Sequence, residues 1–251
     1  MPYELDHVAL AAPDISEALQ LLAGPLGGTI TSGGNAVGFR VVQVWLGDKT
    51  GEGMTVELIE PWDAERNDFL ARFLAKHGVG PHHLTFKVPD IVDALDRLRE
   101  AGYNAVNVNL SEPEWREAFL LPREAQGTVV QLAQPGQVLS DRAAQLAHVA
   151  AHGPRQNPRW WDDTPYAIAP PTYLRRVVLA TTSLPAALAF FGALLGGEEA
   201  ASGSGWIELA WPGGAHLRIE ERRDRAPGID RLEIEGIDVE TTVLGARLTP
   251  A

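Results

Sequence analysis

The chain repeats a short pattern at a nearly constant distance, and this repeat limits the folds open to it. Residues 5–14 and 82–90 each read as an apolar strand with a histidine near its start and a Pro-Asp turn at its end. His83 follows His7 by 76 residues, and Gln131 follows Glu57 by 74. A near-constant period indicates a duplicated supersecondary unit. The four residues are therefore expected at symmetry-related points of one structure.

Each unit reads as a strand, a helix and three further strands. Apolar residues at helical spacing predict helices over residues 15–23 and 91–101, and Asp14 can cap the first. The pattern is an α+β fold of repeated βαβββ units. Strands are expected at residues 5–11, 29–32, 39–46, 54–59, 83–88, 105–109, 118–121 and 128–132.

Residues 133–171 break this pattern. Ser140 can cap a helix that runs to about Ala151, and several prolines then surround Trp160 and Trp161. We interpret the segment as a linker wrapped over one or both neighbouring domains, with its tryptophans packed, because so much exposed aromatic area would be unusual. The predicted division is a two-unit domain at residues 1–134, a linker at 135–171 and a second copy at 172–251.

The second copy is degenerate and truncated. Residues 174–180 resemble residues 5–11, and residues 184–197 resemble residues 15–28. Further strands are expected at residues 206–211 and 216–221. Residues 229–235 are expected to begin a fourth unit that ends after its helix.

Arginines stand in the second copy at the points that match the ligand-type residues of the first. These are Arg176, Arg218 and Arg231. Arginine stays protonated and offers no lone pair, so this half is not expected to bind a metal in the equivalent way. Packing or ion pairing is favoured over an anion pocket built from these side chains.

The composition excludes several classes of protein. The formal net charge is −12, which argues against a general electrostatic attraction to nucleic acid. There is no cysteine, so neither a disulfide nor a thiolate metal site is available. The chain shows no signal peptide and no apolar run near the ~20 residues that span a bilayer. We therefore expect a cytoplasmic protein without membrane or nucleic-acid partners.

His7, Glu57, His83 and Gln131 are all residue types that can hold a metal. Neutral imidazoles with a carboxylate suit a divalent ion such as Zn, Ni, Co, Mn or Fe. Burying a charge or an amide without a partner costs roughly a few kcal/mol, which a metal or a hydrogen-bond network removes. His148 and His152 also have i, i+4 spacing, but no acidic partner is near them in the sequence, and a structural role is favoured.

The duplicated unit resembles the vicinal oxygen chelate superfamily, which includes the glyoxalases and the methylmalonyl-CoA epimerases. The likeness to the epimerases lies in residues 6–14, 56–61, 69–86 and 90–102. It implies two units closing into a half-open barrel, with metal ligands His7, Glu57, His83 and Gln131. His83 is preferred to His82 because it aligns with His7, and His82 is expected to point to the opposite face of the strand.

The resemblance also contains departures. The epimerases usually have Gln where this chain has Glu57 and Glu where it has Gln131, so the two types are exchanged. They carry a second catalytic Glu before the third strand, whereas residues 32–40 contain no carboxylate here. Glu57 is therefore the first candidate for the catalytic residue, while Glu60 is expected to face the other way.

The implied function is that of a metal-dependent isomerase or lyase acting on a small oxygen-rich substrate through a metal-bound enolate. One alternative is a non-catalytic protein of the same fold that binds or sequesters a small molecule. Another is an Fe(II) dioxygenase, against which Gln131 counts because those enzymes place a carboxylate there. A truncated unit leaves sheet edges that need cover, which favours a homodimer.

Overall fold

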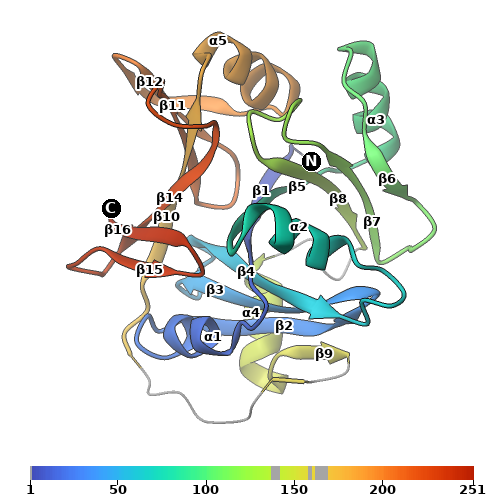
Figure 1. The fold of residues 1–251 in the computed structure, drawn as a ribbon. Coiled ribbons are helices and arrows are strands. Elements are labelled where there is room, and N and C mark those ends of the chain that lie inside the picture. The colour runs from blue at the N-terminus through green and yellow to red at the C-terminus, as the bar shows by residue number, and fades with distance from the viewer. Residues whose placement is uncertain (1, 137–141, 158–159, 162–168) are drawn as a thin grey trace.

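The computed structural model describes residues 2–136, 142–157, 160–161 and 169–251, and it contains two curled sheets (Figure 1). The first, sheet A, holds most of the chain before residue 158. Its strands run in the order β6 (Val106–Asn109), β7 (Trp115–Leu120), β8 (Val129–Pro135), β5 (Gly80–Lys87), β1 (Glu4–Ala11), β4 (Gly53–Trp62), β3 (Gly38–Gly47), β2 (Thr29–Ala36) and β9 (Arg155–Asn157).

Sheet A contains the two predicted βαβββ units. Strand β1 pairs with β4 in parallel within the first unit and with β5 in antiparallel across to the second. Helices α1 (Ser16–Ala23) and α3 (Ile91–Glu100) follow β1 and β5, and a helix that was not predicted, α2 (Phe69–His77), joins the units. Asp14 accepts a hydrogen bond from the backbone N–H of Ser16, at the start of α1.

Sheet B repeats this strand order in the second half of the chain. Its helical segment consists of α5 (Leu184–Ala187) and the π-helical η2 (Leu188–Leu194). The strands run β11 (Glu198–Gly203), β12 (Trp206–Ala210), β13 (His216–Glu221), β10 (Tyr173–Thr181), β14 (Gly228–Glu235), β16 (Ala246–Pro250) and β15 (Thr241–Val243).

The prediction of a helix in the fourth unit is wrong. After β14 the chain turns through residues 236–240 and enters β15 directly, then β16. Five residues are too few for a helix that crosses the face of a sheet. The fourth unit therefore contributes only strands.

The two halves share one hydrophobic core. Val8, Leu58 and Leu84 of sheet A belong to the same buried cluster as Val177 and Leu217 of sheet B. The ring centroids of Phe86 in sheet A and Trp211 in the second half are 5.2 Å apart, so this contact joins the two halves. Since the core fills the space between the sheets, the opposite face of each sheet is left for polar side chains.

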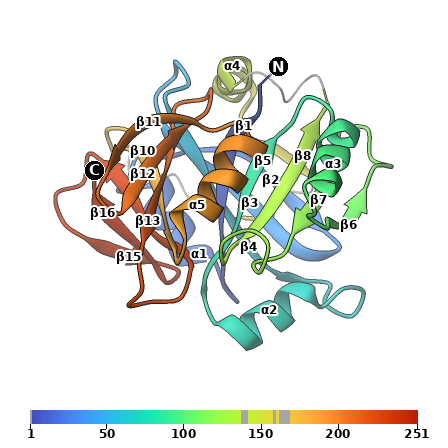
Figure 2. The same cartoon turned by 90° about the horizontal axis from the view of Figure 1, so that it is seen from above.

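The segment between the halves attaches to sheet A. Helix α4 (Arg142–His152) buries Leu146 and Val149, and β9 pairs in parallel with β2. Trp160 donates a hydrogen bond to the carbonyl of Gly34, so it packs as predicted. Ser140, the predicted cap, lies outside the described residues. Helices α4 and α2 lie at opposite ends of the sheet A strands (Figure 2).

Gly127 provides a test of how closely the halves are packed. Its φ is +87°, and a Cβ placed there would overlap the Pro227 carbonyl of the second half. Gly102 has nearly the same φ, +86°, with nothing within 4 Å of such a Cβ. We expect G102A to cost about 1 kcal/mol of unfolding free energy for its left-handed backbone. G127A should cost roughly 1–3 kcal/mol more, because the neighbouring backbone must move.

Urea denaturation of both variants measures this difference. Equal losses in the two would show that the halves do not approach each other closely at Gly127.

Candidate metal centre

Three of the four predicted ligands converge on one face of sheet A. In the register of the sheet, Ala9 of β1 lies opposite Glu57 on β4 and opposite His83 on β5. His7 is two residues earlier on β1, so it points to the same face. The alternate residues of these strands, such as Val8, face the shared core. Three adjacent strands thus bring together residues that are 76 positions apart in the chain.

The three side chains are close enough to share one ion. One ligand atom from each of His7, Glu57 and His83 lies within 4.8 Å of the other two. His7 Nε2 is 3.5 Å from Glu57 Oε2, and His83 Nε2 is 3.6 Å from Glu57 Oε1. All three residues are buried. Two imidazoles and a carboxylate are the donor set that Zn and related divalent ions use.

One atom of this cluster lacks a hydrogen-bond partner. His83 Nε2 is buried and makes no hydrogen bond to any described residue. A buried polar atom normally has a hydrogen-bond partner, and burying it without that hydrogen bond costs free energy. A metal ion between the three residues would supply that partner, so the residues present fit a divalent ion.

Gln131 lies beside this cluster and contacts it through His83 and through the Thr85 hydroxyl. Its Oε1 accepts a 2.5 Å hydrogen bond from Thr85 Oγ1, and that hydroxyl is 2.8 Å from His7 Nε2. Its Nε2 donates to Glu117. Gln131 is therefore oriented by two neighbours, whereas the other three predicted ligands face one another directly.

The expectation that His82 points away from His83 is wrong. The two Nδ1 atoms are 2.8 Å apart, and the His82 ring packs against Phe73 of α2. The pairing of β1 with β5 shifts between Ala9 and Leu10, and this irregularity disturbs the strict alternation that the expectation assumed. Burial lowers the pKa of His82 to about 4.

The two histidines of the cluster have different electrostatic surroundings. Burial alone would lower the pKa of His7, but the Glu57 carboxylate and the hydrogen bond to Asp6 raise it above its ordinary value. Burial, with His82 and His7 close by, holds the pKa of His83 well below its ordinary value. His83 is therefore neutral at pH 7, which is the form that binds a metal.

Glu117 is a second carboxylate at the site, and the sequence analysis missed it. It lies on β7, and its Oε2 accepts hydrogen bonds of 2.7 Å from Gln131 and 3.1 Å from Trp115. Burial raises the pKa of Glu117, and the Glu57 charge adds to this shift. In the first unit, Gln43 donates in the same way to Glu57. Each unit thus contributes one paired amide and carboxylate.

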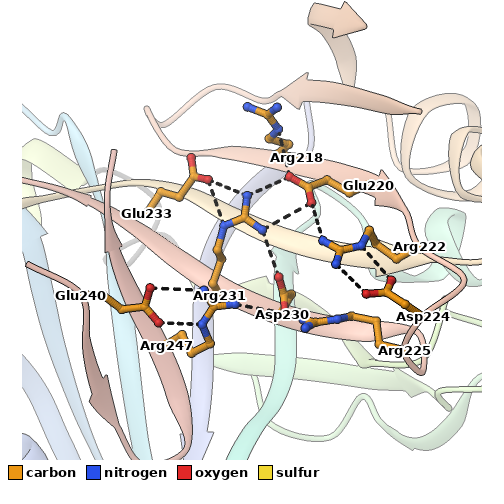
Figure 3. Close-up of polar contacts among 10 residues, drawn as sticks. All are labelled: Arg218, Glu220, Arg222, Asp224, Arg225, Asp230, Arg231, Glu233, Glu240 and Arg247. Atoms are coloured by element: carbon orange, nitrogen blue, oxygen red, sulfur yellow. Dashed lines mark hydrogen bonds and ion pairs between the residues drawn. The ribbon is translucent and has the colours of Figure 1, made fainter. Parts of the chain in front are cut away.

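Sheet B holds arginines at the matched points, in a network of ion pairs. In sheet A, Ala9 lies opposite Glu57 and His83, and in sheet B its counterpart Val178 lies opposite Arg218 and Arg231. Two residues earlier, His7 lies opposite Thr85, and its counterpart Arg176 lies opposite Glu233. Figure 3 shows Arg231 of β14 among the acidic side chains of Glu233 and Asp230 on its own strand and Glu220 on β13.

The distances confirm ion pairing for these three arginines. Arg231 donates to Glu220 at 2.8 Å and to Glu233 at 2.9 Å. Arg176 donates to Glu208 at 3.0 Å and to Glu233 at 2.9 Å. Arg218 Nε lies 3.4 Å from Glu220 Oε1, and its guanidinium also stacks 4.0 Å from the centre of the Trp206 ring. Sheet B thus has charge pairs at the position where sheet A gathers its candidate metal ligands.

Comparison with known proteins identifies relatives of the first half of the chain. The family profile of the Glyoxalase/Bleomycin resistance protein/Dioxygenase superfamily matches residues 6–119. An ethylmalonyl-CoA/methylmalonyl-CoA epimerase of Cereibacter sphaeroides is 30% identical over 136 residues, which are 52% of this chain and 96% of that protein. The mitochondrial methylmalonyl-CoA epimerase of Dictyostelium discoideum is 28% identical over 139 residues, 52% of this chain and 78% of that protein.

One solved structure matches the whole chain. A hypothetical protein from Staphylococcus aureus aligns over 100% of both chains with a TM-score of 0.67 at 10% identity, which shows a shared fold. The curled sheets and the sequence matches define the class. The chain belongs to the Glyoxalase/Bleomycin resistance protein/Dioxygenase superfamily, and its N-terminal half is similar to methylmalonyl-CoA epimerases.

The ion pairs of sheet B give a pH-dependent prediction. The hydrogen bond from Arg231 lowers the pKa of Glu220 below its ordinary value. A depressed carboxyl pKa adds stability above the unfolded-state pKa, and this stability is lost as the pH falls through the folded-state pKa. At pH 7, E220Q should lower the unfolding free energy by about 1 kcal/mol, because the pair is only partly shielded from water.

Denaturation at pH 7 and at pH 3.5 measures this effect, and the difference from wild type should shrink at the lower pH. E240Q, at an exposed pair with Arg247, is the control and should change less. A deficit for E220Q that did not change with pH would contradict the assignment.

Proposed function

We propose that the protein is a divalent-metal enzyme of isomerase type that acts on a small acyl thioester. The observation that carries this proposal is the cluster of His7, Glu57 and His83, with the unpartnered Nε2 of His83 aimed into it. Gln131 completes the proposed ligand set. A bound divalent metal would supply Lewis acidity that stabilises negative charge on the substrate oxygens.

The proposed substrate is a 2-alkylmalonyl-CoA. Two relatives are named as epimerases of this class, and the chain covers 96% and 78% of their lengths. Epimerisation removes the proton from the carbon between the two carbonyl groups and returns a proton to its opposite face. Such a reaction needs a proton-transfer group on each side of that carbon.

Glu57 is the proposed catalytic carboxylate on the side of the first unit. Gln43 donates a 2.9 Å hydrogen bond to Glu57 Oε2, which holds this carboxylate in place. Glu117 is the proposed partner on the side of the second unit, where Gln131 and Trp115 orient it. A burial-raised pKa suits Glu117 to carry and release a proton near neutral pH. This arrangement accounts for the lack of a carboxylate in residues 32–40.

Sequestration of a small molecule without turnover is the second candidate. The observation that favours it is burial, because His7, Glu57 and His83 are only 1–8% exposed. The two candidates differ in turnover, since a sequestering protein would bind a substrate without converting it.

Three expectations stay proposals. They are the division of the chain at residues 1–134, 135–171 and 172–251, the homodimer and the cytoplasmic location. Every residue of β11, one edge of sheet B, is exposed, which leaves that edge available to a second copy. Sedimentation velocity measures the mass in solution. No helix in the described part of the chain has the length and apolar character needed to cross a membrane.

The metal assignment predicts the loss of one equivalent of metal. We expect the wild-type protein to hold one divalent ion per chain, and H7A or H83A to hold none while keeping the wild-type circular dichroism spectrum. Mass spectrometry after reloading and gel filtration measures the metal content. H148A and H152A, at exposed positions of α4, are the controls. Stoichiometric metal in the H7A/H83A double variant would refute the site, and iron as the native ion would favour oxygenase chemistry.

The assignment of Glu117 predicts a loss of inversion without a loss of metal. With methylmalonyl-CoA in D2O, E117Q should epimerise at least about 100-fold more slowly than wild type, because one face of the carbon lacks its proton-transfer group. Metal content should not change. Proton NMR follows deuterium at the reacting carbon, and E112Q in the preceding loop is the control. Wild-type inversion rates in E117Q would assign the second face to another group.

A further inference from the structure

Asp6 is a buried carboxylate that connects the metal centre to α4. It is 5% exposed, and its Oδ2 lies 2.7 Å from Nδ1 of His7. Its other oxygen, Oδ1, lies 2.5 Å from Lys87 Nζ and 2.5 Å from Arg142 Nη2. Lys87 belongs to β5 beside Asp6, whereas Arg142 comes from α4, 136 residues later in the chain. Two cations thus bind one oxygen, and the other oxygen faces the histidine.

Arg142 is held rigidly in this position. Its Nη1 donates to Gln145 Oε1 one turn along α4, and its guanidinium lies 4.9 Å from the centre of the Trp45 ring. The side chain is only 11% exposed. Arg142 therefore makes its ion pair largely out of contact with water, where such an interaction is screened little.

The geometry determines which nitrogen of His7 carries a proton. An ionised carboxylate only accepts hydrogen bonds, so Nδ1 of His7 must be the donor to Asp6. Nε2, the atom 3.5 Å from Glu57, is then the nitrogen left to bind a metal. A carboxylate behind a metal-binding histidine fixes the ring orientation and raises its basicity. Arg142 and Lys87 place two positive charges against Asp6 Oδ1, which offsets the cost of burying its carboxylate.

We propose that Arg142 is a positioning residue of the metal centre, acting through Asp6 to hold His7 with Nε2 directed at Glu57. Helix α4, from the segment between the two halves, is then part of the centre. This inference rests on the proposed metal function. A purely structural ion pair would stabilise α4 without changing the affinity for a metal, and this difference separates the two roles.

The test measures Zn2+ affinity by titration calorimetry in R142M, R142K, D6N and the R142M/D6N double variant. We expect R142M to weaken binding about 10-fold, and R142K to recover most of that loss. The double variant should bind as D6N does, because Arg142 acts only through Asp6. L146A, which removes an apolar contact of α4, is the control and should lower the melting temperature without changing the affinity.

A second readout does not depend on metal. Nitrogen-15 NMR of the metal-free protein reports the tautomer of His7, and R142M should show less of the Nδ1–H form than wild type. Unchanged affinity and an unchanged tautomer in R142M would overturn the proposal, as would losses from R142M and D6N that multiply in the double variant. If the wild-type protein bound no Zn2+, the metal function would fail, and the tautomer would still decide the role of Arg142.

Discussion

The pairing of β1 with both β4 and β5 is the constraint on which the site and the core depend together. Ala9 lies opposite Glu57 on one side and His83 on the other. This register gathers the ligand-type residues on one face, and alternation sends Val8 and Leu10 into the shared core. A shift of one residue would bury the polar set in the core and expose the apolar set. The hydrophobic core and the metal centre therefore enforce the same register.

The two sheets carry different polar side chains at matched positions. At matched positions, sheet A carries histidine and glutamate, and sheet B carries arginine with glutamate partners. The ion pairs of Arg176 and Arg231 give both partners a hydrogen bond, whereas His83 Nε2 has no hydrogen-bond partner among the described residues. Sheet A therefore has, at its histidines and carboxylate, an arrangement suited to a ligand. This contrast supports the proposal of a metal site in the first half.

The sequence repeat predicted much of the site, and its failures have local physical causes. His7, Glu57 and His83 come together because one period relates both their sequence positions and their strands. His82 was misplaced because an irregular pairing is not visible in a pattern of alternating residues. Glu117 was missed because it has no counterpart at its register position in the first unit, where Val41 stands. Its role as a partner of Gln131 depends on a contact across two strands.

The sequence by itself determined the βαβββ repeat, the ligand types and the loss of those ligands in the second half. These follow from periodicity and residue chemistry, which are local properties. The tertiary structure alone decided that the fourth unit lacks a helix, that both halves share one core, and that Arg142 of α4 reaches Asp6. The shared core and the Arg142–Asp6 pair join residues more than 100 positions apart, and no short-range pattern encodes which of many charged residues will meet.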